Sequence, residues 1–192
     1  MAAIDDDADP AAGFTVVRED EMWRGHIVRL CHLELTDPAG VHFERDVVRH
    51  PGAVAVVPMT DDGTVTLVRQ YRAAVGRSVL EVPAGTCDVD GEALEKTARR
   101  ELVEEAGLEA AQVEPLARVY NSPGYSDQVT TIFLARGLRP CPTGRTGVEE
   151  QHMTVEEVDV RRAHALVAEG RVVDETTALG LLLARDAHEG HP

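Results

Sequence analysis

The sequence predicts a mixed α/β or α+β layered domain, and three observations support this fold class. A length of 192 residues suits one domain with a small appended subdomain. The hydrophobic share of 43% is enough to build a core. Along the chain, strand patterns come first, and a central helix, more strands and two final helices follow them.

The first 50 residues predict a leader and a small β-subdomain. Residues 1–13 are acidic and lack the apolar stretch of a secretory signal, so we expect a disordered lead-in. Residues 14–50 form the subdomain, with a strand at residues 24–35 and its hairpin partner at residues 41–50. The main domain then comprises residues 51–192.

The main domain is predicted to place strands before and after one central helix. The strands are expected at residues 53–59, 64–71, 78–83, 113–120, 129–135 and 153–158. The central helix spans residues 91–106 and ends at Gly107, a plausible C-cap. Residues 139–147 are rich in Pro and Gly and predict a mobile loop. Helices follow at residues 160–169 and 175–188, and Asp174 can cap the second one.

The charge of the chain excludes several classes of partner. A net charge of −15 argues against a nucleic-acid groove, which needs a basic stripe. An acidic protein that handles phosphates needs cations as intermediaries.

The chain has no run of 18 apolar residues, so nothing in the sequence is expected to span a membrane. Its three cysteines have no metal or redox spacing and indicate reduced cytoplasmic thiols.

Carboxylates interrupt the apolar face of the central helix. On a helical wheel, Leu94, Ala98 and Leu102 define an apolar stripe. Glu101 and Glu105 fall within about 20° of Leu94, on the stripe itself. Burying an unpaired carboxylate costs several kcal/mol, and two carboxylates four residues apart repel each other. A sequence selected only for helix stability would have apolar residues at these two positions.

Three interpretations of the acidic cluster remain open on spacing alone. The helix end could fray, so that the glutamates reach water. Arg99 or Arg100 could pair with them, although neither shares the stripe on the wheel. Divalent cations could neutralise the cluster, since Glu101, Glu105 and the flanking Glu104 offer hard oxygen ligands that suit Mg²⁺ or Mn²⁺.

The segment from Gly85 to Leu108 resembles the signature of the Nudix hydrolase family. Glu92, seven further residues and the run Arg100-Glu101-Leu102-Val103-Glu104-Glu105-Ala106-Gly107-Leu108 match every position of that signature. The one departure is that six residues, rather than five, separate Gly85 from Glu92. The extra residue lies in the loop, where it leaves the spacing within the helix intact.

The resemblance implies an α/β/α sandwich with a mixed sheet and metal-dependent cleavage of a nucleoside diphosphate linked to another group. Roles carry over residue by residue to the positions that match. Glu101 and Glu105 match the main metal ligands, Glu104 an auxiliary one, Ala84 a carbonyl ligand, and Gly85, Glu92, Arg100 and Gly107 the structural positions of the motif. The expected cofactor is therefore Mg²⁺, with Mn²⁺ as an alternative.

The flanks resemble the ADP-ribose pyrophosphatase group of this family, in its actinobacterial form. The stretches that carry this resemblance are residues 46–54, 70–72, 80–85, 122–127 and 149–153. The expected reaction is hydrolysis of ADP-ribose to AMP and ribose 5-phosphate. Other substrates stay open, namely another nucleotide sugar, NADH or an oxidised nucleotide. So does a ligand-sensing Nudix module without catalysis.

The same resemblance suggests which residues meet the substrate. The ions would bridge the diphosphate oxygens, and Glu149, with Glu150 as second choice, would take a proton from the attacking water. The substrate-binding candidates are Arg72 for phosphate, Asp127 for the distal ribose, the loop residues Ser122, Pro123 and Gly124, and Trp23 for stacking on adenine. Plain packing is the alternative for Trp23. Related enzymes often exchange N-terminal strands across a homodimer, so we expect a homodimer here.

Overall fold

A computed structural model describes residues 13–145 and 147–190 of the chain. The predicted disorder of the acidic leader lies, except for Gly13, outside the described residues. No helix in the described part of the chain is long and apolar enough to cross a membrane.

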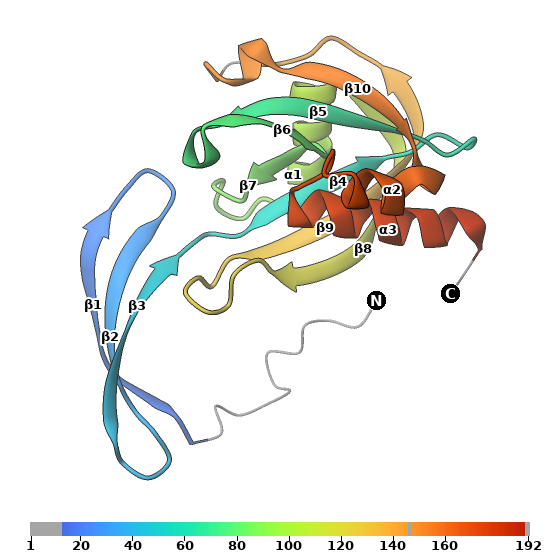
Figure 1. Cartoon of the computed structure of the whole chain (residues 1–192). Helices are drawn as coiled ribbons and strands as arrows, with labels where there is room; N and C mark the ends of the chain where they lie inside the picture. The colour runs from blue at the N-terminus through green and yellow to red at the C-terminus, as the bar shows by residue number, and fades with distance from the viewer. Residues whose placement is uncertain (1–12, 146, 191–192) are drawn as a thin grey trace.

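The N-terminal strands form a sheet of their own, which extends away from the rest of the molecule (Figure 1). It consists of β1 (Thr15–Arg24), β2 (Arg29–Thr36) and β3 (His42–Arg49), paired antiparallel in the order β1-β2-β3. Sequence analysis predicted the β2–β3 hairpin and missed β1. Two register irregularities interrupt β1, and nearly all of its residues are exposed, so it lacks the alternation that identifies a strand.

The central sheet is mixed and has the order β7-β4-β9-β8. Its strands are β4 (Ala53–Pro58), β7 (Ala84–Thr86), β8 (Leu108–Tyr120) and β9 (Val129–Pro140). Strand β4 runs parallel to β9, while β7 and β8 are antiparallel to their neighbours. Because β4 is buried on both faces, it is a continuous apolar run rather than an alternating one.

A second sheet has the order β10-β5-β6 and is entirely antiparallel. Its strands are β5 (Thr64–Arg72), β6 (Arg77–Glu81) and β10 (Thr154–Asp159). The short 3₁₀ turn η1 (Ala73–Val75) and Gly76, which has a left-handed φ of 65°, connect β5 to β6. Ala74 and Val75 of this turn line a cavity of about 510 Å³.

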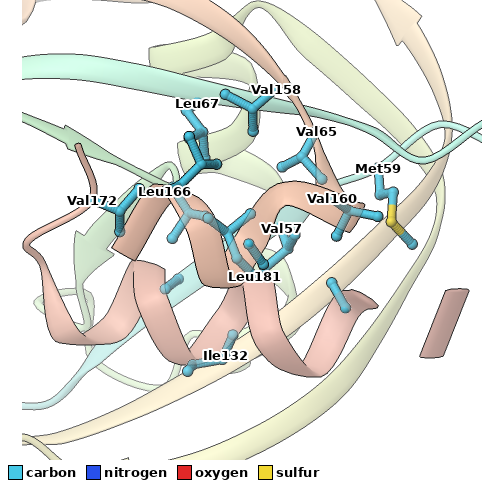
Figure 2. Close-up of a cluster of buried hydrophobic side chains, with 14 of the residues drawn as sticks. Val57, Met59, Val65, Leu67, Ile132, Val158, Val160, Leu166, Val172 and Leu181 are labelled. Atoms are coloured by element: carbon cyan, nitrogen blue, oxygen red, sulfur yellow. The ribbon is translucent and has the colours of Figure 1, made fainter. Parts of the chain in front are cut away.

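Helices cover both faces of the central sheet. On one face α1 (Leu94–Glu101) continues into the π-helical turn η2 (Leu102–Ala106) and packs on Val54 and Val56. On the other face α2 (Ala163–Ala168) and α3 (Glu175–Glu189) cover Val57. Figure 2 shows this second core, in which Leu166 and Leu181 lie beside Val57. The arrangement is the predicted α/β/α sandwich. Two 3₁₀ turns, η3 (Glu150–His152) and η4 (Val160–Arg162), flank β10.

The structure corrects three details of the sequence prediction. The central helix begins at Leu94 rather than at residue 91 and ends in a π turn. Leu94 is 40% exposed, so the apolar stripe is formed by Ala98 and Leu102 without it. Residues 139–140 belong to β9 rather than to the predicted mobile loop. The two predicted caps are confirmed, since Asp174 accepts from the Thr177 amide and Gly107 has a left-handed φ of 65°.

Candidate active site

Two glutamates at the end of α1 are buried against strand β7. Glu101 is 8% exposed and Glu105 is 5% exposed. Oε2 of Glu105 accepts a hydrogen bond of 2.9 Å from the Ala84 amide. A Cβ atom at Gly85 would lie 2.1 Å from Cδ of Glu101, so only glycine permits β7 to pack this closely on the helix. The structure therefore brings Ala84 and Gly85 together with Glu101 and Glu105, which follow at least 16 residues later in the sequence.

Burial raises the pKa of both carboxyl groups. Desolvation raises the pKa of Glu101 to about 7, against a smaller lowering by the neighbouring Arg100. Desolvation also raises the pKa of Glu105 to about 8, although the hydrogen bond from Ala84 lowers it. The neighbouring charge of Glu101 raises the pKa of Glu105 as well, and the charge of Glu104 raises the pKa of Glu101. A buried carboxylate pair of this kind is stabilised by a cation.

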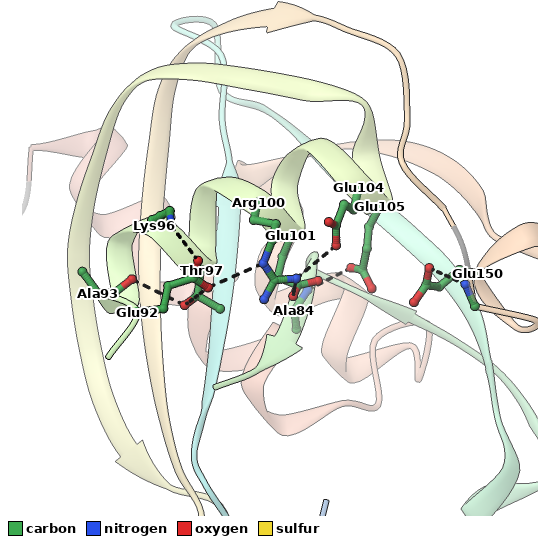
Figure 3. Close-up of polar contacts among 11 residues, drawn as sticks. Ala84, Glu92, Ala93, Lys96, Thr97, Arg100, Glu101, Glu104, Glu105 and Glu150 are labelled. Carbon is green, nitrogen blue, oxygen red and sulfur yellow. Dashed lines mark hydrogen bonds and ion pairs between the residues drawn. The ribbon is translucent and has the colours of Figure 1, made fainter. Parts of the chain in front are cut away.

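Arg100 lies among the acidic side chains of the motif (Figure 3). Its Nη1 atom is 2.7 Å from Oε1 of Glu101 and donates to Oε2 of Glu104 at 3.1 Å. Its buried Nε atom lies 3.5 Å from Glu92 but has no hydrogen-bond partner among the residues that the structure describes. Glu92 also accepts from the Thr97 hydroxyl at 3.0 Å. The helical wheel placed Arg100 away from the stripe, but its long side chain reaches Glu101 and Glu104.

The donor set fits a hard divalent cation, whereas the geometry is not preformed. All the donors are carboxylate oxygens, which Mg²⁺ and Mn²⁺ prefer, and two of the groups are desolvated beside each other. Yet no group of three or more Asp, Glu, His or Cys side chains in the described ranges is arranged to hold a metal ion. Glu104 is turned toward Arg100. Binding a cation therefore requires side-chain adjustment around Arg100.

A cavity of about 510 Å³ is lined by residues of β7, the strand that packs on the carboxylate pair, whereas Glu101 and Glu105 are not among its described lining residues. Ala84 and Gly85, which contact Glu105 and Glu101, form part of its wall. Arg72 also lines it and donates to both carboxylate oxygens of Glu81 at 3.0 Å through Nε. The sequence predicted a role for Arg72 and none for Glu81. The available signal was an ionisable residue between Leu80 and Val82, within a short apolar run.

The predicted Ser-Pro-Gly loop connects β8 to β9. The Ser122 carbonyl accepts from the amides of Tyr125 and Ser126, which makes residues 122–126 a compact turn. The residues on either side of this turn, Asn121 and Gln128, line the large cavity, whereas Ser122, Pro123 and Gly124 are not among its described lining residues. The loop thus contributes its flanking residues to the cavity.

Asp127 attaches the same loop to the end of the N-terminal sheet. Its Oδ1 accepts from the His50 amide at 2.8 Å, and its Oδ2 accepts from Arg49 at 3.2 Å. Arg49 in turn donates to Glu19 of β1, and this contact lowers the pKa of Glu19 to about 2. Asp127 lines a second cavity of about 240 Å³ rather than the large one. Both oxygens of this candidate ribose ligand are therefore engaged within the protein.

Of the two candidate proton acceptors, Glu150 is the one that faces the carboxylate pair (Figure 3). It is partly buried and raises the pKa values of Glu101 and Glu105 through its charge. Its Oε2 accepts from the Gly147 amide at 3.0 Å. Glu149 is exposed and forms the N-cap of η3. Glu150, the second choice made from the sequence, therefore lies closer in charge and position to the pair than the exposed Glu149, and the role of either remains a prediction.

Arg145, which the sequence did not indicate as functional, holds the loop before β10 against the helix of the motif. Arg145 donates to the Glu105 carbonyl through Nε at 3.1 Å and through Nη2 at 2.5 Å. Its Nη1 atom donates to the Met153 carbonyl at 2.7 Å. Because the Glu105 carbonyl lies in the last turn of the helix, it lacks a helical partner and attracts a cationic donor. Arg145 thereby connects two segments. One is the helix that contains the metal-ligand candidates, and the other is the loop that precedes β10.

Trp23 lies on β1 and is 58% exposed. It is not among the described residues that line either of the two cavities. Within one chain, its ring therefore faces solvent rather than a binding site.

Fold and site together define a class of protein. It is an α/β/α sandwich with a mixed sheet and a buried carboxylate pair beside an arginine-lined cavity. The family model described as NUDIX domain matches residues 49–175, and the chain belongs to the Nudix hydrolase family. Dependence on divalent metal ions is general in this family.

Curated relatives match most of the chain. The ADP-ribose pyrophosphatase of Mycobacterium tuberculosis is 37% identical over 169 residues, which cover 88% of this chain and 82% of the relative. The ADP-ribose pyrophosphatase of Bacillus subtilis is 34% identical, over 86% of this chain and 89% of the relative. The GDP-mannose pyrophosphatase of Yersinia pestis is 32% identical, over 71% of this chain and 72% of the relative. A solved structure titled as an ADP compounds hydrolase has a similar fold, with a TM-score of 0.81, 21% identity and coverage of 95% and 98%.

Proposed function

We propose that this protein hydrolyses the diphosphate bond of ADP-ribose to AMP and ribose 5-phosphate, with Mg²⁺ as its cofactor and Mn²⁺ as a substitute. The observation that carries the proposal is the buried pair Glu101 and Glu105 beside the cavity wall at Ala84 and Gly85. Two curated relatives named ADP-ribose pyrophosphatase, each matching more than 80% of both chains, support the choice of substrate.

The residues of the chain would share the work as follows. Glu101 and Glu105, assisted by Glu104, would hold the cation, with the Ala84 carbonyl nearby. When bound, the cation supplies positive charge that offsets the diphosphate and favours ionisation of the attacking water. Arg72, whose guanidinium is fixed by Glu81, would bind a phosphate oxygen.

Glu150 is our preferred proton acceptor, and Glu149 is the second. The water oxygen attacks one phosphorus atom, and the bond from that phosphorus to the bridging oxygen breaks. The bridging oxygen leaves on the other phosphate, and the water proton passes to the Glu150 carboxylate. Glu150 suits this role because its charge already acts on both Glu101 and Glu105.

A second candidate substrate is another nucleoside diphosphate sugar. The curated relatives named GDP-mannose pyrophosphatase, which are 32% identical to this chain, favour it. A panel of ADP-ribose, GDP-mannose, NADH and an oxidised nucleotide separates these substrates by their kcat/KM values. Turnover of none of them would support the ligand-sensing alternative.

Three substitutions test the assignment of roles. Glu105→Gln should reduce kcat for ADP-ribose by more than about 100-fold. That is the largest loss typical of residues that only support a metal ligand, and a ligand itself should matter more. Glu150→Gln should reduce it by about 10²–10⁴-fold, and Glu149→Gln by much less. Glu109→Gln, at an exposed glutamate on β8, is the matched control and should be near wild type. Near wild-type turnover by Glu105→Gln and Glu150→Gln would refute both assignments.

We also propose that residues 14–50 form a subdomain that joins two copies in a homodimer. Large apolar side chains are exposed on this sheet, among them Val16, Met22 and Trp23. Pairing of two copies would cover them and place Trp23 within reach of a substrate. A mass of twice 20.8 kDa, the mass of one chain, in a light-scattering measurement would agree with this proposal.

The three free thiols support a cytoplasmic location.

A further inference from the structure

We propose that Arg77 is a second diphosphate-binding residue, opposite Arg72 on the cavity wall, and that it selects diphosphates over monophosphates. This inference rests on the function proposed above and assigns part of its specificity to one side chain. Arg77 begins strand β6 and lines the cavity of about 510 Å³.

The register of the hairpin places two like charges directly opposite each other. Strands β5 and β6 pair antiparallel, and Arg72 and Arg77 are the last pair before the turn. Like charges at directly opposed positions destabilise an antiparallel pair. A hairpin selected only for stability would have a neutral or acidic residue at one of these positions. The repulsion is therefore compatible with a function that needs both guanidinium groups, those of Arg72 and Arg77.

Only one of the two arginines is neutralised within the protein. Arg72 forms a double hydrogen bond with Glu81, whose side chain is 8% exposed. Arg77 is exposed, and among the described residues its side chain has no hydrogen bond or ion pair. Its guanidinium thus keeps all of its N–H donors available for a ligand.

The position of the pair relates it to the carboxylates. Arg72 shares the wall of the cavity of about 510 Å³ with Ala84 and Gly85, which contact Glu105 and Glu101. Arg77 is paired with Arg72 across the β5–β6 ladder and lies in the wall of the same cavity. In this proposal, a diphosphate in the cavity meets Arg72 with one phosphate and Arg77 with the other.

The chemistry of the pair fits a diphosphate better than a neutral or monoanionic ligand. A guanidinium binds two oxygens of one phosphate through parallel hydrogen bonds. Two guanidinium groups side by side match two adjacent phosphates. In a chain with a net charge of −15, this local positive charge is the feature that would attract an anionic substrate to an acidic protein. A monophosphate product would meet only one of the two groups and would leave more easily.

The test compares Arg77→Gln and Arg77→Lys with wild type and with Arg139→Gln, an exposed arginine on β9. Calorimetry measures the Kd of ADP and of AMP without added metal, and steady-state assays with Mg²⁺ measure KM and kcat for ADP-ribose. For Arg77→Gln we expect the Kd of ADP and the KM to rise about 10- to 100-fold, as for loss of a charge-assisted hydrogen bond. The Kd of AMP should change less, and kcat should stay within about threefold. Arg77→Lys should restore part of the affinity.

Thermal unfolding separates this role from a structural one. Because Arg77→Gln removes the repulsion with Arg72, its Tm should equal or exceed that of wild type while its affinity falls. A lower Tm with wild-type KM and Kd would overturn the inference and leave the proposed function standing. A wild-type protein that neither binds ADP nor hydrolyses ADP-ribose would overturn both.

Discussion

The two motif glutamates, Glu101 and Glu105, lie in an environment that opposes their charge. Their pKa values are raised from an ordinary value of 4.5 to about 7 and about 8, mainly by desolvation. The sequence already indicated this conflict, because the helical wheel placed both carboxylates on the buried stripe. It gave the wrong expectation for Arg100, because a wheel records the direction of Cα–Cβ and not the reach of a long side chain.

These raised pKa values predict a pH dependence for the metal-free protein. Between about pH 4.5 and pH 8 the folded state keeps protons that the unfolded chain has released. The free energy of unfolding should therefore fall as the pH rises through this window. Glu105→Gln removes the contribution of Glu105 and keeps a carbonyl oxygen that can accept from Ala84.

The comparison is made by thermal unfolding in a buffer with a chelator. The difference in Tm between Glu105→Gln and wild type should grow in favour of the variant from pH 5 to pH 8. Added Mg²⁺ should raise the Tm of wild type more at pH 8 than at pH 5, because it binds the ionised form. A Tm difference that does not change with pH would show that Glu105 titrates normally.

At the scale of elements, the contact of β7 with α1 determines where the carboxylates lie. Strand β7 is only three residues long and was not predicted, because so short a segment carries no periodicity. Hydrogen bonds from three directions hold it and the residues before it. The Val82 amide donates to Thr177 of α3, the Val56 amide donates to the Pro83 carbonyl, and the Ala84 amide donates to Glu105.

Gly85→Ala tests this contact. The new methyl group would lie 2.1 Å from Glu101 Cδ, so either the side chain or β7 must move. We expect a loss of about 1–3 kcal/mol in the free energy of unfolding and a large loss of activity. Gly124→Ala is the control for stability alone, since nothing lies within 4 Å of a Cβ at that position. Equal stability for the two variants, with wild-type turnover for Gly85→Ala, would show that the packing of β7 on α1 is not a constraint.

The elements that sequence analysis found are those with strong, regular patterns. The buried run at β4 and the alternation at β5 fixed their positions to within a residue or two. The π turn η2 escaped detection because its residues have the same spacing as an α-helix in the sequence. Arg145 escaped detection because its partners are backbone carbonyls, which leave no mark on the sequence.

At the scale of the whole molecule, the sandwich contains the proposed site, whereas the N-terminal sheet contributes residues to the second cavity. The sandwich supplies the carboxylate pair, the large cavity and the arginines that line it. The N-terminal sheet reaches the loop after β8 through Arg49 and Asp127, at the second cavity. Trp23 is exposed and lines neither of these two cavities within one chain, so its proposed contact with substrate belongs to the proposed homodimer.

The most direct test of the central claim is a crystal structure of Glu150→Gln with Mg²⁺ and ADP-ribose, in which slow turnover preserves the substrate. We predict that the cation contacts Glu101 and Glu105, with Arg100 displaced from between Glu101 and Glu104. We also predict that the diphosphate lies in the large cavity between the carboxylate pair and the two arginines, Arg72 and Arg77. A nucleotide bound elsewhere, or a carboxylate pair that still binds Arg100 and no cation, would contradict the account.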